Sequence, residues 1–167
     1  MRTIATIPAS NNGSRQNLSS WIAYLRTHAA IKRQLNADLL EGHGLTLSDY
    51  EVLLRLSQAD DHAMRRIDLA DSVLLTASGI TRLLDGLERA GYVEKAACAS
   101  DARVSYAKLT DSGLGKLREA SVTHLAGIEE LFTGRYSDEE LDTLGELLAR
   151  LPTTGRDDEA LACTAES

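Results

Sequence analysis

Aliphatic side chains recur at intervals of three and four residues through most of this 167-residue chain, and that spacing favours α-helices. The only prolines are Pro8 and Pro152, and aromatic residues make up 4% of the sequence. Long helices with aliphatic packing are therefore favoured over a sandwich of many strands. We expect one mostly helical protein with an adequate core.

The first long helix is predicted from about residue 16 to 41, closed by Gly42 and Gly44. In the segment LTLSDYEVLLRL, Ser48 and Glu51 have the spacing of a capping box, in which side chains satisfy the free N–H groups at a helix start. A second helix is therefore expected from there to about Ser57.

Two further helices follow, separated by a few residues. The first lies in RRIDLADSVLL, and four of its residues are expected to point inward: Ile67, Leu69, Ala70 and Val73. The second begins after the N-cap Thr76 and stops at Gly91, because glycine readily takes the left-handed conformation that ends a helix.

The helix after Thr76, in TASGITRLLDGLERAGYV, has two different faces. The apolar face is predicted to join the core: Ile80, Leu83, Leu84 and Leu87. The opposite face is small, polar and rich in hydrogen-bond donors: Ser78, Thr81, Arg82 and Asp85. Such a face suits either plain solvent or a partner that must come very close.

The convincing strand candidates are GYVEKA and RVSYAKL, which flank the turn-prone ACASDA and predict a hairpin. Thr110 then caps another long helix, and Ser137 with Glu140 caps a final helix that Pro152 ends. Helix, tight turn, helix and hairpin is the order of a winged helix-turn-helix, whose second helix enters the major groove of DNA.

The predicted fold class is therefore mostly α with a small β-hairpin wing. The outer helices carry more apolar positions than a lone two-helix extension could shield, which favours a dimer. The chain divides into disordered ends (1–15 and 153–167) and one domain (16–152), made of a winged helix-turn-helix lobe (46–110) and dimerisation helices (16–45 and 111–152).

In this fold the polar face has a use. Small residues at Ser78 and Gly79 let the helix N-terminus approach DNA, where its free N–H groups attract phosphate. Arg82 can donate two hydrogen bonds to guanine, and Thr81 can contact a base or the thymine methyl. The alternative is the solvated face of an ordinary amphipathic helix.

The net charge of −7 does not exclude DNA, because the charge is unevenly distributed. Residues 63–110 hold seven basic and six acidic side chains, a net charge of +1, so the rest of the chain carries −8. The lobe can therefore present a basic face.

The hairpin region SDARVSYAKLTDSG resembles a pattern of the multiple-antibiotic-resistance regulators, the MarR family. That pattern has Asp, one residue, Arg, a strand ending in Leu-Thr, and a Gly three residues after the Thr. The matching positions are Asp101, Arg103, Leu109, Thr110 and Gly113. LTLSDYEVLLRLS and LADSVLLTASGITRLLDGLERAGYV also match in order and spacing, so the resemblance extends from about Trp21 to Leu151.

The resemblance implies a homodimer whose first and last helices interleave and whose two lobes bind a pseudo-palindromic double-stranded DNA operator. It also implies repression, relieved by a small aromatic or phenolic effector bound between the dimerisation helices and the lobe. In relatives that respond to such ligands, a Trp in the first helix borders the pocket, so the predicted ligand-binding residues are Trp21, Tyr24 and Arg26. The alternative role for Trp21 is packing at the dimer interface.

At the hairpin tip, Arg103 can enter a narrow minor groove while Asp101 holds its side chain, the alternative being a surface ion pair. Gly86 stands where many members of the family have Arg. We therefore expect either modest, salt-sensitive binding or a dependence on Arg65, Arg66 and Arg89 for contacts to the DNA backbone. The predicted DNA contacts are Arg65, Arg66, Thr76, Ser78, Thr81, Arg82, Arg89, Asp101 and Arg103.

The sequence also bears on functions other than DNA binding. The chain has no G-x-S-x-G elbow, complete phosphate loop or dinucleotide fingerprint, so neither an enzyme nor a cofactor is expected. Its four histidines lack short metal-ligand spacing. Two alternatives remain: a winged-helix protein-interaction module without DNA binding, and a redox-responsive regulator acting through Cys98, which is otherwise an inert surface thiol.

With no apolar run near 20 residues and no secretion signal, a cytoplasmic protein is expected.

Overall fold

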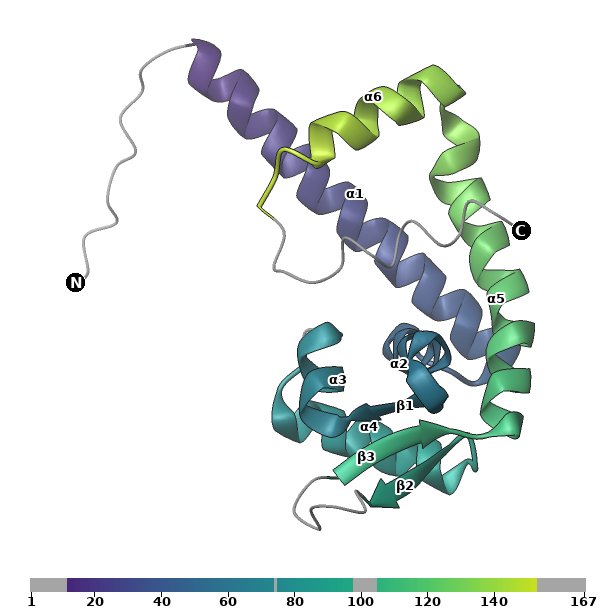
Figure 1. Cartoon of the computed structure of the whole chain (residues 1–167). Coiled ribbons are helices and arrows are strands. Elements are labelled where there is room, and N and C mark those ends of the chain that lie inside the picture. Colours follow the sequence, from purple (N-terminus) through teal and green to yellow (C-terminus); the bar gives the residue numbers. More distant parts are fainter. Residues whose placement is uncertain (1–11, 74, 98–104, 153–167) are drawn as a thin grey trace, which may run out of the picture.

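The computed structural model describes residues 12–73, 75–97 and 105–152. Two long helices, α1 (Asn12–His43) and α5 (Asp111–Leu131), pack together where they meet, and a compact lobe lies beside their junction (Figure 1). A short η2 (Thr133–Arg135) and α6 (Asp138–Leu148) follow at the end of α5 that is far from the lobe. The lobe contains α2 (Leu47–Gln58), η1 (Asp60–His62), β1 (Ala63–Arg65), α3 (Arg66–Ser72), α4 (Ala77–Arg89), β2 (Val93–Ala97) and β3 (Ser105–Leu109).

Helix α1 is longer than the predicted span of 16 to 41. It begins at Asn12, inside the segment expected to be disordered, and ends at His43. Gly42 lies within the helix, whereas Gly44 has φ +67° and takes the left-handed conformation that ends it. The predicted disordered ends otherwise lie outside the described residues.

The predicted capping box of α2 was wrong by two residues. The N-cap is Thr46, whose Oγ1 accepts a hydrogen bond from the Asp49 N–H at 3.1 Å, while the Asp49 carboxylate accepts from the Thr46 N–H at 2.8 Å. Asn36 of α1 accepts a bond from the Leu47 N–H at 3.0 Å. This contact between helices satisfies a free N–H group and favours the earlier start.

The sheet has a strand that the sequence did not reveal. Its order is β1-β3-β2, and all pairs are antiparallel, with Met64 and Lys95 on either side of Ala107. β2 and β3 form the predicted hairpin. β1 contains only three residues and pairs with a segment more than forty positions away, so no local pattern marks it.

The core of the lobe consists of aliphatic side chains from the lobe helices together with α1 and α5. The largest completely buried side chains are Leu39, Val52, Leu53, Leu56, Leu69, Ile80 and Leu84. The prediction for Ile67 was wrong: it is 68% exposed. Ile67 precedes the buried Leu69 by two positions, which places it on the other side of α3.

No helix in the described part of the chain combines the length and the apolar character that crossing a bilayer requires.

Candidate nucleic-acid interface

The N-terminus of α4 is capped as predicted. Thr76 Oγ1 accepts a hydrogen bond from the Gly79 N–H at 3.1 Å and lies 3.2 Å from Ser78 Oγ. A Cβ at Gly79 would lie only 3.2 Å from the same Thr76 oxygen, so a glycine keeps this cap compact. The helix therefore begins with small exposed polar groups around its free N–H groups.

The two faces of α4 lie as the sequence predicted. Ile80, Leu84 and Leu87 are buried in the core, and Leu83 packs partly buried against it. The polar residues are all exposed on the outer side: Ser78, Thr81, Arg82 and Asp85. At the end of the helix, Gly91 has φ +77°, as a C-terminal stop requires.

The side chain of Arg66 lies between α3 and α4. Its Nη2 is 3.9 Å from Asp85 Oδ1, and the Arg66 side chain is 20% exposed. Nε and Nη2 are shielded from solvent and have no hydrogen-bond partner among the described residues. This arginine therefore joins the two helices of the helix-turn-helix unit, whereas the sequence placed it among the phosphate contacts.

Arg65 and Arg89 are both exposed. Arg65, on β1, donates from Nε to the Tyr106 hydroxyl on β3 at 3.3 Å. Arg89, in the last turn of α4, donates from Nε to the Asp85 carbonyl oxygen at 3.0 Å. Both guanidinium groups therefore lie on the surface of the lobe, one on β1 and the other at the end of α4.

Thr110 has a role that its capping signal did not reveal. Its Oγ1 accepts from the Gly113 N–H at 3.0 Å, as predicted for an N-cap, and also donates to the Gly91 carbonyl oxygen at 2.7 Å. The hydroxyl therefore ties the start of α5 to the turn that leads into the hairpin. Asp101, Arg103 and Cys98 lie outside the described residues.

The predicted ligand residues lie on the half of α1 that projects from the lobe. The rings of Trp21 and Tyr24 are stacked with centroids 6.0 Å apart, and Tyr24 stacks on His28 at 6.2 Å. Trp21 is 54% exposed, and Tyr24 and Arg26 are exposed as well. The chain thus brings Trp21 and Tyr24 together but does not enclose them.

A polar contact zone joins the lobe to α5. The ring of Tyr50 lies 4.4 Å from that of His124, and Tyr50 Oη is 3.2 Å from Ser121 Oγ. Burial lowers the pKa of His124, whose Nδ1 is shielded from solvent and has no hydrogen-bond partner among the described residues.

The described segments contain no group of three or more His, Cys, Asp or Glu side chains that could hold a metal ion.

A helix-turn-helix formed by α3 and α4, followed by the β2–β3 hairpin, defines a winged helix-turn-helix protein. The family model for the MarR family matches residues 45–105. Two curated relatives come from Bacillus subtilis. The transcriptional repressor YetL is 35% identical over 114 residues, 66% of this chain and 68% of YetL. The transcriptional regulator MhqR is 29% identical over 138 residues, 83% of this chain and 92% of MhqR.

Among solved structures, a MarR family regulator from Streptomyces coelicolor, Sco3205 in complex with DNA, matches with a TM-score of 0.76 and 25% identity. The match covers 80% of this chain and 87% of Sco3205. This chain belongs to the MarR family of winged helix-turn-helix transcription factors. It is a DNA-binding transcriptional regulator.

Proposed function

We propose that this protein is a homodimeric repressor that recognises a pseudo-palindromic operator through the outer face of α4. The proposal rests on one observation: α4 packs its aliphatic face against the core while it leaves Ser78, Thr81 and Arg82 exposed beside a capped N-terminus. YetL is named a transcriptional repressor, and the similar Sco3205 was solved in complex with DNA. Both facts support the same role here.

Each exposed group has a chemical task in the proposed complex. Arg82 donates two hydrogen bonds to guanine, and Thr81 contacts a neighbouring base. Thr76 and Ser78 lie at the N-terminus of α4, where the free N–H groups of the helix bind a phosphate. Arg65 and Arg89 add phosphate contacts, and Arg103 enters the minor groove with Asp101 holding its side chain. Arg66 acts indirectly, by fixing α4 against α3 through Asp85.

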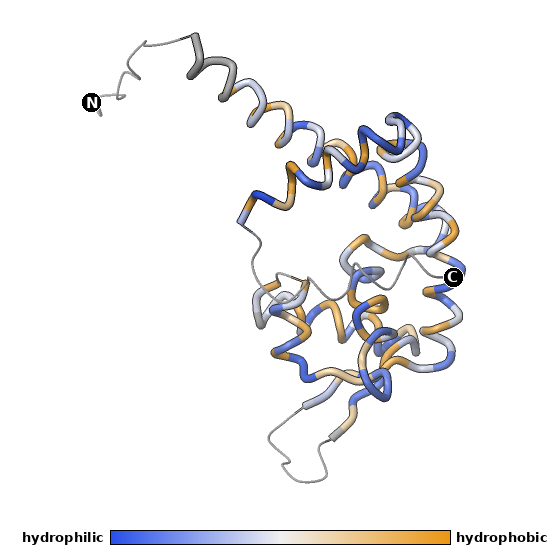
Figure 2. The backbone as a smooth tube through the Cα atoms, turned by 45° about the horizontal axis from the view of Figure 1, so that its top comes forward, coloured by the Kyte–Doolittle hydropathy of each residue, from blue (hydrophilic) through white to orange (hydrophobic). Residues whose placement is uncertain are grey.

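Exposed apolar side chains support the proposed dimer. Figure 2 shows that hydrophobic residues recur along the projecting half of α1 and on α6. Within the described residues, α6 packs against very little of its own chain. The exposed large apolar residues of these outer helices and the segments next to them include Leu18, Trp21, Ile22, Tyr24, Leu25, Val122, Leu125, Tyr136, Leu147, Leu148 and Leu151. A partner that covers them would remove a large apolar area from water.

We further propose that a small aromatic effector binds beside Trp21 and Tyr24, with Arg26 attracting a phenolate or carboxylate. The exposed ring stack on α1 supports this site, because a partner subunit would enclose it on the dimer side. An effector held there would contact the helix that connects the dimer to the lobe. Release of the operator then follows if the effector favours a lobe spacing that does not fit two half-sites about 34–36 Å apart.

A gel shift with the DNA upstream of the protein's own gene, repeated at several salt concentrations, tests the DNA proposal. A sequence-specific DNA-binding protein binds this duplex in preference to scrambled DNA, and its affinity falls steeply with salt concentration, whereas a protein-interaction module shows neither property.

Light scattering on the free protein tests the dimer. A mass of one chain at micromolar concentration contradicts it, and Leu125→Glu, on an exposed apolar position, should shift a dimer toward monomer.

A further inference from the structure

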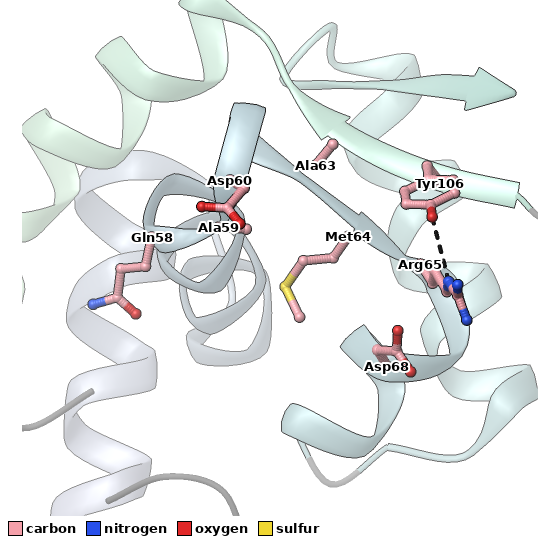
Figure 3. A pocket seen from close by; sticks show the side chains of 8 residues that line it. All are labelled: Gln58, Ala59, Asp60, Ala63, Met64, Arg65, Asp68 and Tyr106. Carbon is pink, nitrogen blue, oxygen red and sulfur yellow. Dashed lines mark hydrogen bonds between the residues drawn. The ribbon is translucent and has the colours of Figure 1, made fainter. Parts of the chain in front are cut away.

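A cavity of about 400 Å³ opens on the lobe between η1, β1, α3 and β3 (Figure 3). It lies apart from the outer face of α4 and from the ring stack on α1, since its lining includes no residue of either helix. Its volume falls within the range of small-molecule sites. Arg65, a proposed phosphate contact, is the one lining residue that also has a part in the proposed DNA recognition or dimer.

The lining combines an apolar floor with a charged rim. Met64 and Tyr106 are half-buried and supply a thioether and an aromatic ring. Asp60 and Asp68 are exposed at the rim, and Figure 3 shows the Met64 side chain between them. Arg65 also lines the cavity, and its guanidinium donates to the Tyr106 hydroxyl at 3.3 Å.

These groups favour a cation over an anion. Two carboxylates can each accept charge-assisted hydrogen bonds from an amidinium or ammonium group, whereas they repel an anion that approaches Arg65. A thioether and a phenol ring provide contact for a flat apolar body, and an aromatic face also attracts positive charge. A neutral polar molecule can also donate hydrogen bonds to the carboxylates, but it lacks the attraction between opposite charges.

We propose that this cavity binds a small organic cation with a flat aromatic body, its charged group beside Asp60 and Asp68 and its ring against Met64 and Tyr106. The site is separate from the effector site proposed on α1 and takes a ligand of the opposite charge. Because Arg65 stands at its edge and β3 forms one wall, an occupant also lies next to groups assigned to the DNA-facing side of the lobe.

Titration of the full-length protein with benzamidine, without DNA, tests the site independently of the proposed function. The only methionines are Met1 and Met64, so the ε-methyl NMR signal of Met64 reports occupancy directly, and Met64→Leu assigns it. Benzamidine should shift this signal with saturation, and the neutral isostere benzamide should bind at least tenfold more weakly. No saturable shift up to 10 mM benzamidine, or equal shifts with benzamide, would overturn the proposal.

Two isosteric variants locate the charged contacts. Asp60→Asn and Asp68→Asn should each weaken benzamidine binding about threefold to tenfold, and the double variant more. Asp71→Asn is the matched control, because Asp71 is an exposed carboxylate of the same helix as Asp68 but does not line the cavity. Circular dichroism checks that each variant is folded. If folded Asp60→Asn and Asp68→Asn proteins bind benzamidine as tightly as the control, the cation site is refuted.

Discussion

Gly113 lies directly against the carbonyl oxygen of Tyr92, with no room for a side-chain carbon between them. Gly113 is in the first turn of α5, and Tyr92 immediately precedes β2. The same Tyr92 oxygen accepts a hydrogen bond from the Thr110 N–H at 3.1 Å. Close backbone contact therefore sets the orientation of the hairpin relative to the helix that leads toward the proposed dimer interface.

Gly113→Ala should destabilise the protein by about 2–3 kcal/mol, because the added methyl meets backbone atoms that cannot rotate away. Urea unfolding monitored by circular dichroism measures this change. Gly115→Ala is the matched control on the same helix, since a Cβ there meets nothing within 4 Å. The control should be neutral or up to about 1 kcal/mol more stable, as alanine is the better helix former. Equal stabilities for the two variants would contradict the contact.

The features that the sequence predicted correctly are those with local causes. The α4 helix has an N-cap at Thr76, a glycine stop at Gly91 and a regular aliphatic face between them. Each signal lies within a few residues of the structure that it determines, so the exposed polar face could be named in advance.

The features that the sequence missed depend on contacts between distant segments. β1 exists because Met64 pairs with Ala107, and the cavity beside it exists because β1 brings Met64 next to α3 and Tyr106. The sequence predicted Arg66 as an exposed DNA contact, but the packing of α3 on α4 shields part of its guanidinium from solvent. The start of α2 lies at Thr46, two residues before the predicted one, and the Leu47 N–H there donates a hydrogen bond to the side chain of Asn36 on α1. No local pattern contains this information.

His124 makes stability depend on pH in a predictable direction. Burial against Tyr50 lowers its pKa in the folded state below the unfolded value of 6.5. The unfolded chain then binds the proton more readily, so the contribution of this group is fully present above pH 6.5 and is lost as the pH falls through the lower folded pKa.

Urea unfolding at pH 8, 7, 6 and 5 measures this dependence. His124→Gln should flatten the decrease of the unfolding free energy between pH 7 and 5, because glutamine cannot titrate. His28→Gln, at an exposed position of α1, is the matched control for replacing a histidine by glutamine. A His124→Gln protein that loses stability toward pH 5 as steeply as the parent would rule out this assignment.

Arg66 and Arg89 should differ in their effect on the salt dependence of operator binding. Arg89 is exposed at the end of α4 and can reach a phosphate, so Arg89→Met should make the slope of log K against log salt shallower by about 1. Arg66 is enclosed between α3 and α4, so Arg66→Met should weaken binding without changing the slope. Fluorescence anisotropy from 50 to 300 mM salt separates the two. A shallower slope for Arg66→Met would restore it as a direct phosphate contact.

Arg82→Ala should lose discrimination at one base-pair position of the operator, by about 1–3 kcal/mol, while other positions keep theirs. The reason is that Arg82 is exposed on the outer face of α4, where a guanidinium can donate two hydrogen bonds to one guanine. Competition binding with operators carrying single base-pair changes measures the loss position by position. Arg135→Ala is the control, because Arg135 lies in η2, at the end of α5 far from the lobe. If Arg82→Ala weakens binding to every sequence equally, Arg82 contacts the phosphate backbone and the base contact proposed for it is wrong.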